Sequence, residues 1–125
     1  MHACPNGAFA CGMTFIAAAI VAGCANPPLR ERTGEMISPY ASTQACVDVK
    51  AGERIDFRFR SDTPVRYAVV SREGSAEMAS VAEDGVLEDS RIFAPAYPRE
   101  YCLTIEAGPA GANVDYTIAV RPPLP

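Results

Sequence analysis

The sequence is poor in the residues on which many enzymes, nucleic-acid-binding proteins and membrane-spanning helices depend. It contains one histidine, His2, so nothing after that position can complete a Ser-His-Asp triad or a Cys-His pair. Its longest basic stretch is Arg-Glu-Arg at 30–32, which falls short of the basic patch that nucleic acid requires. No apolar run reaches the roughly 20 residues of a transmembrane helix. The sequence therefore predicts no histidine-dependent catalysis and no nucleic-acid partner.

Charge is absent from the amino-terminal part, because every Asp, Glu, Lys and Arg lies between Arg30 and Arg121. Within this uncharged part, residues 13–23 (MTFIAAAIVAG) form an unbroken apolar run. Such a run is too short to cross a bilayer comfortably, but it is typical of the apolar region of an export signal. The residues before it offer no Lys or Arg, which departs from the usual signal. We expect a signal peptide over 1–23, with an ordinary buried helix as the alternative.

The apolar run ends in Val21-Ala22-Gly23-Cys24, an aliphatic residue, two small residues and a cysteine. This stretch resembles the lipobox of bacterial lipoproteins. The resemblance implies that diacylglycerol is attached to the Cys24 thiol, that the chain is cut between Gly23 and Cys24, and that the new amine is often acylated with a fatty acid such as palmitate. Two or more acyl chains anchor a protein stably, whereas one does so marginally. Under the enterobacterial sorting rule, Ala25 favours the outer membrane, with the protein facing the periplasm.

Five cysteines divide by position along the chain. Cys4 and Cys11 would leave with the signal peptide, and Cys24 would carry the lipid. Cys46 and Cys102 remain as an even pair in an oxidising compartment, where a disulfide persists. On the chain-entropy model such a bridge stabilises the fold by about 4 kcal/mol. Two unpaired buried thiols are the alternative. Two thiols alone do not make a zinc site, so we expect no metal and no other cofactor.

Residues 24–44 are expected to form the lipidated cysteine and a tether, because this stretch is rich in Pro, Ser and Thr and shows no sustained period. A tether of this length could reach roughly 65 Å if fully stretched. The folded domain would then occupy 45–121. A proline-rich tail, 122–125, cannot donate ladder hydrogen bonds and would end the last strand.

Residues 45–121 alternate apolar and polar side chains with a period of two. The clearest segment is 54–60, where Ile55, Phe57 and Phe59 alternate with charged residues, as in a strand with one buried and one wet face. Turn residues at 61–64 and at Asp84-Gly85 divide the segments. We therefore expect an all-β fold, an antiparallel β-sandwich of seven or eight short strands. Further inward residues are Val65, Tyr67, Val69, Tyr101, Leu103, Ile105, Val114, Tyr116, Ile118 and Val120, with Cys46 and Cys102 on the outer side.

The order of these features is informative: a strand with Cys46, a Gly-Glu turn at 52–53, then Phe-Ala-Pro at 93–95 and Tyr-Cys-Leu at 101–103. Over roughly 45–120 it resembles the GOLD-type (Golgi dynamics) β-sandwich, in which an early cysteine pairs with a late one. It is also similar to the pre-peptidase C-terminal jelly rolls of bacteria. Domains of both kinds are mostly interaction or accessory modules, so the resemblance implies binding and not catalysis.

Two acidic pairs, Glu83-Asp84 and Glu88-Asp89, flank Gly85. Acid–base catalysis would need them in a cleft with separated pKa values, and calcium would need several converging oxygen ligands. A solvated loop explains them more simply. We therefore expect no catalytic residue and no metal site.

The sequence permits two interpretations of a group of three charged residues and two interpretations of one tyrosine. Asp56, Arg58 and Arg60 form either a wet sheet face or a binding surface, and the wet face is the simpler interpretation. Tyr97 either caps the open end of the sandwich or presents its ring to a partner.

The sequence thus predicts a membrane-anchored envelope lipoprotein with a non-enzymatic binding or accessory domain for an unidentified protein or glycan partner. The alternative is a small disulfide-bonded inhibitor of a cell-wall hydrolase, which would act by inserting a loop.

Overall fold

A computed structural model describes residues 26–125, which form six antiparallel strands and no helix. The all-β prediction is confirmed, but the predicted seven or eight short strands are six, of which two are long. The predictions for the signal peptide 1–23 and for Cys24 lie outside the described residues. The strands are β1 (Leu29–Ile37), β2 (Ser42–Val49), β3 (Arg54–Glu73), β4 (Ala76–Phe93), β5 (Arg99–Ala107) and β6 (Ala112–Arg121).

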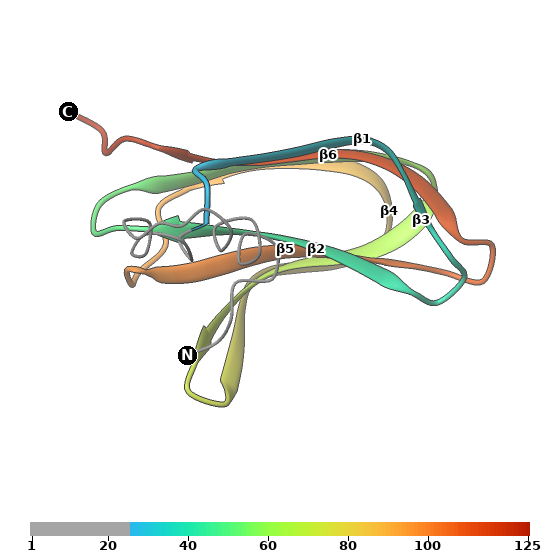
Figure 1. The fold of residues 1–125 in the computed structure, drawn as a ribbon, viewed down its shortest axis with the longest axis horizontal. Helices are drawn as coiled ribbons and strands as arrows, with labels where there is room; N and C mark the ends of the chain where they lie inside the picture. The colour runs from blue at the N-terminus through green and yellow to red at the C-terminus, as the bar shows by residue number, and fades with distance from the viewer. Residues whose placement is uncertain (1–25) are drawn as a thin grey trace, which may run out of the picture.

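The sheet is organised around β3, which pairs with three other strands. Its first part pairs with β6, as in Phe57 opposite Ile118, and its second part pairs with β5, as in Val69 opposite Leu103. β4 follows β3 along both parts. The sheet therefore curls into two facing layers, a first layer in the order β1-β6-β3-β4 and a second in the order β2-β5-β3-β4 (Figure 1).

A bend in β3 and β4 joins the two layers. The predicted turn at 61–64 is wrong, because β3 runs through it and only changes partner there. The Ser61 hydroxyl donates a 2.6 Å hydrogen bond to the Thr63 carbonyl, and the Thr63 hydroxyl donates one of 2.6 Å to the Gly111 carbonyl. The predicted hairpin at Asp84-Gly85 is also wrong: Gly85 has a φ of 71° inside β4 and supplies its irregularity at the bend.

The core lies between the two layers and follows the predicted alternation. Ile55 and Phe57 are fully buried, and Tyr67 packs its ring against Phe57 and Phe59 at centroid distances of 5.5 and 4.9 Å. These aromatic contacts span the two halves of β3, so they hold the layers together. The inward faces of the predicted segments are confirmed, except that Val120 is only partly buried.

The predicted tether is wrong for most of its length. Residues Leu29–Ile37 form β1, which pairs with β6, and β2 begins at Ser42. β1 is an edge strand held by its backbone hydrogen bonds, so it needs little side-chain alternation. A register shift between Arg32 and Glu35 interrupts it further, where the Gly34 amide donates a 2.7 Å hydrogen bond to the Asp115 carboxylate.

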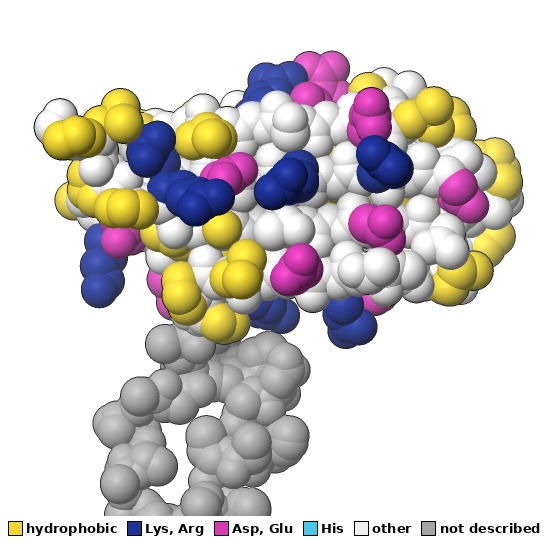
Figure 2. All heavy atoms as spheres, turned by 90° about the horizontal axis from the view of Figure 1, so that it is seen from above, with side chains coloured by type: hydrophobic (Ala, Val, Ile, Leu, Met, Phe, Trp, Pro, Cys, Tyr) yellow, Lys and Arg dark blue, Asp and Glu magenta, His cyan; other side chains and the backbone are white. Residues whose placement is uncertain are grey.

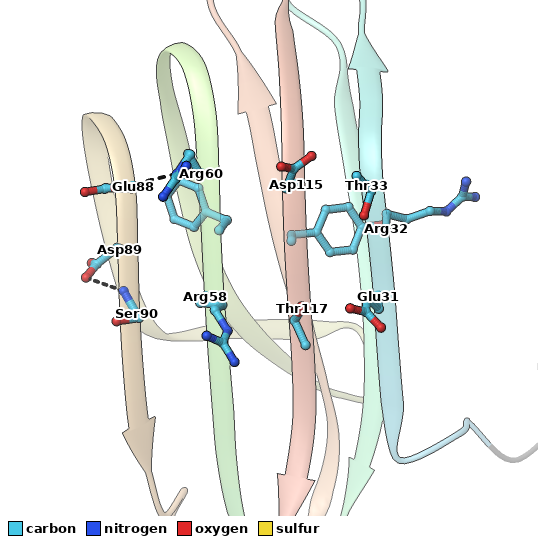
Figure 3. Close-up of a pocket in the computed structure, with 12 residues that line it drawn as sticks. Glu31, Arg32, Thr33, Arg58, Arg60, Glu88, Asp89, Ser90, Asp115 and Thr117 are labelled. Atoms are coloured by element: carbon cyan, nitrogen blue, oxygen red, sulfur yellow. Dashed lines mark hydrogen bonds and ion pairs between the residues drawn. The ribbon is translucent and has the colours of Figure 1, made fainter.

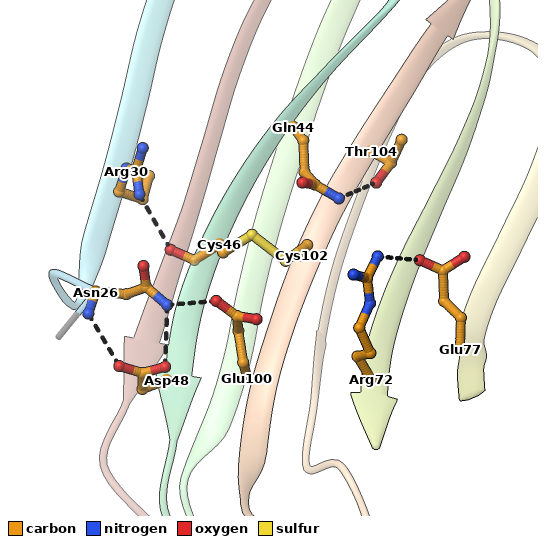
Figure 4. Close-up of a disulfide and its surroundings, with 10 residues drawn as sticks. All are labelled: Asn26, Arg30, Gln44, Cys46, Asp48, Arg72, Glu77, Glu100, Cys102 and Thr104. Atoms are coloured by element: carbon orange, nitrogen blue, oxygen red, sulfur yellow. Dashed lines mark hydrogen bonds and ion pairs between the residues drawn. A yellow bond between two sulfur atoms is a disulfide. The ribbon is translucent and has the colours of Figure 1, made fainter. Parts of the chain in front are cut away.

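The structure contains the predicted disulfide between Cys46 and Cys102. The two cysteines are directly opposed in the β2–β5 ladder, and their neighbours Ala45 and Leu103 point into the core. The bridge therefore lies on the outer side of the second layer (Figure 4). Among residues 26–125, no helix is long and apolar enough to cross a membrane.

Candidate binding surfaces

A hollow of about 600 Å³ lies on the outer face of the first layer (Figure 3). All four strands of that layer contribute to it. The alternation that buries Phe57 and Phe59 turns Arg58 and Arg60 outward, onto the floor of the hollow. Its lining consists of Glu31, Arg32, Thr33, Arg58, Phe59, Arg60, Glu88, Asp89, Ser90, Asp115, Tyr116 and Thr117.

Cross-strand pairing arranges this lining in rows. Arg58 is flanked by Thr117 of β6 and by Ser90 of β4, and Arg60 is flanked in the same way by Asp115 and Glu88. Each arginine thus lies between two groups that carry oxygen, as Figure 3 shows. A surface that alternates guanidinium, hydroxyl and carboxylate groups is suited to a polar partner.

The charges in the hollow differ in how far they are neutralised within the protein. Arg60 and Glu88 form an ion pair of 3.6 Å, but both side chains are largely exposed, so the pair contributes little to stability. Within residues 26–125, the side chains of Arg58 and Glu31 make no hydrogen bond and no ion pair. An unpaired guanidinium offers planar donors that fit a carboxylate or two sugar hydroxyls.

The three residues of the predicted charged face therefore lie in two different places. Arg58 and Arg60 line the hollow, whereas Asp56 accepts hydrogen bonds of 2.9 and 2.8 Å from Arg121 at one end of the layer. The sequence alone does not indicate Glu31 and Thr33, because both lie in the stretch without a sustained period that predicts a tether. The Arg-Glu-Arg stretch at 30–32 was their only visible signal.

A charged cluster closes the side of the sandwich along β4. The Tyr67 hydroxyl donates a short hydrogen bond to the Asp89 carboxylate, and Arg91 lies 3.4 Å from Asp89 and 3.0 Å from Glu83. This hydrogen bond from Tyr67 is the main reason why the pKa of Asp89 is lowered. Burial of the Tyr67 ring and the same hydrogen bond raise the pKa of its phenol.

The two acidic pairs around Gly85 do not converge on one site. Asp84 contacts Arg66 at 3.4 Å on the outer side of the second layer, whereas Glu88 contacts Arg60 in the first-layer hollow. Within residues 26–125, the only acid- and thiol-bearing side chains close enough to share a metal are Cys46, Glu100 and Cys102. The two sulfur atoms of that group are already joined to each other.

The two ends of the sandwich each expose large apolar side chains (Figure 2). One end, here called the Tyr40 end, is formed by the loops 38–41 and 108–111. Tyr40 is 69% exposed and has a φ of 61°, and its amide donates a 3.1 Å hydrogen bond to the Gly108 carbonyl. Met36 lies close by and is also exposed. This loop is therefore tied to its neighbour while its aromatic ring is free.

The opposite end, here called the Asn26 end, contains the first described residue and the carboxyl terminus. Tyr97 lies in the loop after β4 and is half exposed, with the Arg99 guanidinium 4.6 Å from its ring centroid. The Tyr97 carbonyl accepts a 2.7 Å hydrogen bond from the Tyr101 hydroxyl. The loop is thus held in place, and the Tyr97 ring is turned towards solvent instead of closing the core.

Comparison with protein-family models gives no match, and comparison with curated sequences gives no significant match. Solved structures of similar fold exist. Aeromonas hydrophila PliG, a periplasmic inhibitor of g-type lysozyme, aligns with a TM-score of 0.56 at 12% identity over 74% of this chain and 86% of its own. The Yersinia pseudotuberculosis-derived mitogen aligns with a TM-score of 0.51 at 10% identity over 77% of this chain and 86% of its own. At such low identities these likenesses establish a shared β-fold.

Proposed function

We propose that this protein is a lipid-anchored lipoprotein of the bacterial envelope whose β-sandwich binds a protein or glycan partner without catalysis. The observation that carries the binding role is the first-layer hollow, where Arg58 and Glu31 are both exposed and unpaired within the described residues. In the proposal, Arg58 donates to a carboxylate or to sugar hydroxyls of the partner. Glu31 accepts from hydroxyl or amide donors, and Thr117 and Ser90 complete the polar surface.

The anchor in this proposal rests on the lipobox-like stretch that ends at Cys24, and the disulfide of the folded domain is consistent with an oxidising compartment. The outer membrane, with the domain facing the periplasm, is the proposed location. The resemblance to GOLD-type and pre-peptidase C-terminal sandwiches is part of the same proposal and agrees with an accessory module.

Binding by the hollow is tested with a charge reversal. The purified protein would be incubated with peptidoglycan sacculi and, separately, with envelope proteins immobilised from the same bacterium. Arg58→Glu should reduce retention at least about tenfold, because one charge-assisted bidentate contact is worth about 1.5–3 kcal/mol. The matched control is Arg72→Glu, which changes an exposed arginine on the outer face of the second layer. Equal retention of both variants would contradict the proposed surface.

An inhibitor of a cell-wall hydrolase is the second candidate, favoured by the Tyr40 end. There an exposed tyrosine stands on a hydrogen-bonded loop, which is the form that insertion into an enzyme cleft requires. The fold shared with the Aeromonas hydrophila inhibitor is compatible with this role. The test is the activity of g-type and other lysozymes at micromolar concentrations of the protein, with Tyr40→Ala as the variant. Undiminished activity with the unaltered protein would remove this candidate.

A further inference from the structure

We propose that the Asn26 end of the sandwich lies against the bilayer surface, so that the Tyr40 end points away from the membrane. This inference rests on the proposed lipid anchor and goes beyond it, because it assigns a membrane-contacting surface to the folded domain. The sequence predicted the opposite arrangement, a domain held off the membrane by a tether of about twenty residues.

The first argument is the way in which the start of the domain is fixed. The backbone amide of Asn26 donates a 2.9 Å hydrogen bond to Asp48, and its side-chain amide donates to Asp48 at 3.0 Å and to Glu100 at 2.9 Å. These acceptors lie at the end of β2 and at the start of β5, beside the disulfide (Figure 4). Asn26 is thereby held by two strands of the second layer.

The second argument is chain length. Cys24 precedes Asn26 by two residues, and two residues span at most about 7 Å. A lipid on Cys24 would therefore bring the bilayer surface to the Asn26 end of the domain. The long spacer that would let the domain stand off or tumble freely does not exist once β1 is part of the sheet.

The third argument is the character of this end. Five large apolar side chains are exposed there: Leu29 at the start of β1, Met78 on the β3–β4 hairpin, Ile92 near the end of β4, Tyr97 in the following loop, and Leu124 in the tail. The register places Leu29 beside Ala119 and places Ile92 beside Asp56, so both lie on the outer rim of the first layer. The tail is held at the same end, because Arg54 Nε donates a 3.1 Å hydrogen bond to the Pro122 carbonyl and Pro123 lies beside Gly52.

These side chains suit the interface between lipid headgroups and acyl chains. Tyrosine rings favour that region, and exposed leucine and isoleucine side chains gain from entering it. Lys50 and Arg54 lie at the same end and can keep their charges in the headgroup layer while their stems approach the lipid. By contrast, the outer face of the second layer beside Asn26 carries Asp48, Glu100 and Arg72, which suits water better than lipid.

Exposed apolar side chains alone would not select this end, because Met36 and Tyr40 are exposed at the opposite one. The Asn26 end is selected because the chain leaves the folded domain there, towards Cys24. With the Asn26 end at the bilayer, the Tyr40 end faces away from it, and the first-layer hollow lies on the flank. Both surfaces then remain accessible to a partner.

The test uses the absence of tryptophan from the sequence, which makes any introduced tryptophan a unique fluorescent reporter. Three single variants of the full chain, Tyr97→Trp, Tyr40→Trp and Gln44→Trp, would be purified from bacterial membranes in lipidated form. They would be reconstituted into vesicles of phosphatidylethanolamine and phosphatidylglycerol, with or without lipids brominated on the acyl chains. Gln44 is an exposed residue of β2 and reports on the outer face of the second layer.

Brominated lipid should quench about half of the Tyr97→Trp emission, since a ring that enters the boundary between headgroups and acyl chains by about 5–10 Å comes within reach of the bromine atoms. The Tyr40→Trp and Gln44→Trp emissions should stay unchanged. A floating protein with no quenching at position 97, or with stronger quenching at position 44, would overturn the inference and leave the anchor intact. A protein that does not float with the vesicles would overturn the anchor, and the inference with it.

Discussion

β3 and β4 run side by side over almost their whole length, from Ile55 opposite Phe93 to Glu73 opposite Ala76, yet they differ in burial. β3 alternates buried and exposed residues, whereas β4 contains no fully buried residue. The difference comes from position, because β3 has hydrogen-bonded neighbours on both sides and β4 has β3 alone. Burial in this protein thus depends on where a strand lies in the sheet as much as on its composition.

The inward face of β4 shows the same contrast. Opposite the buried Phe57 and Phe59 it presents Arg91 and Asp89, which join Glu83 and the Tyr67 hydroxyl in the charged cluster along β4. Inward-pointing charges at a sheet edge discourage pairing with a second chain. β4 therefore completes the sandwich and adds only partly buried apolar side chains to the core, those of Val81, Val86 and Phe93.

The largest expected effect is the truncation of a β3 core residue. Phe57→Ala should lower the free energy of unfolding by about 3–5 kcal/mol, because it removes a fully buried ring and leaves a cavity. Urea denaturation of the purified protein measures this change. The control is Ile92→Ala on β4, an exposed residue whose truncation should cost less than about 0.5 kcal/mol. Equal costs would mean that the two strands do not differ as described.

The next effect concerns the disulfide, which reinforces the second layer on the side away from β4. Replacing both cysteines, Cys46→Ser with Cys102→Ser, should lower the free energy of unfolding by about 2–4 kcal/mol, because the unfolded chain gains conformational freedom. Thermal unfolding under non-reducing conditions provides the measurement. An unchanged melting temperature would show that the bridge does not contribute to stability.

A smaller effect is expected where β3 and β4 meet through Tyr67 and Asp89. Tyr67→Phe should cost about 1–2 kcal/mol, because the buried ring is kept and the Asp89 carboxylate loses its hydrogen bond. Denaturation at about pH 7 measures this loss. The double variant Tyr67→Phe with Asp89→Asn should cost less than the sum of the two single variants, and additive losses would argue against a direct contact.

The hydrogen bond between Tyr67 and Asp89 also predicts that the stability of the protein depends on pH. Because the pKa of Asp89 is lowered in the folded protein, its contribution is complete above the ordinary pKa of a carboxyl group. That contribution is lost as the pH falls through the lowered folded value. Between about pH 5 and about pH 2, the unaltered protein should therefore lose more stability than Tyr67→Phe does. Parallel curves for the two proteins would contradict the role given to this hydrogen bond.

The smallest effect concerns the backbone of β4 at the bend. Gly85 has a φ of 71°, and a Cβ at this position would meet no atom within 4 Å. Gly85→Ala should cost about 1 kcal/mol from backbone strain alone. A stabilising substitution would mean that β4 does not bend at this residue.

The sequence was sufficient to predict the central strands and insufficient to predict the edges. Ile55, Phe57 and Phe59 alternate because each lies between two neighbouring strands, and the period of two was visible for that reason. β1 has no such period, since its backbone does most of the pairing, so the sequence alone predicts a tether there. The residues at 61–64 predict a turn because the same polar groups that close hairpins also stabilise a bend within one strand.

For the candidate binding surfaces too, residues of the central strands could be predicted from the sequence and residues of the edge strands could not. Arg58 and Arg60 could be placed on an outward face from alternation alone. Glu31 and Thr33 join them only because β1 pairs with β6, a contact between distant parts of the chain. Likewise, the position of Asn26 depends on hydrogen bonds to Asp48 and Glu100, for which the sequence gives no signal.

The central claim is that a lipid on Cys24 attaches this β-sandwich to a membrane, and the mass of the amino-terminal peptide tests it most directly. The protein would be purified from the membrane fraction of its native host without an added tag and digested with a protease. The account predicts a first peptide that begins at Cys24 and carries the mass of diacylglycerol, with or without a further acyl chain. A first peptide that begins at Met1 and carries no lipid would contradict the account.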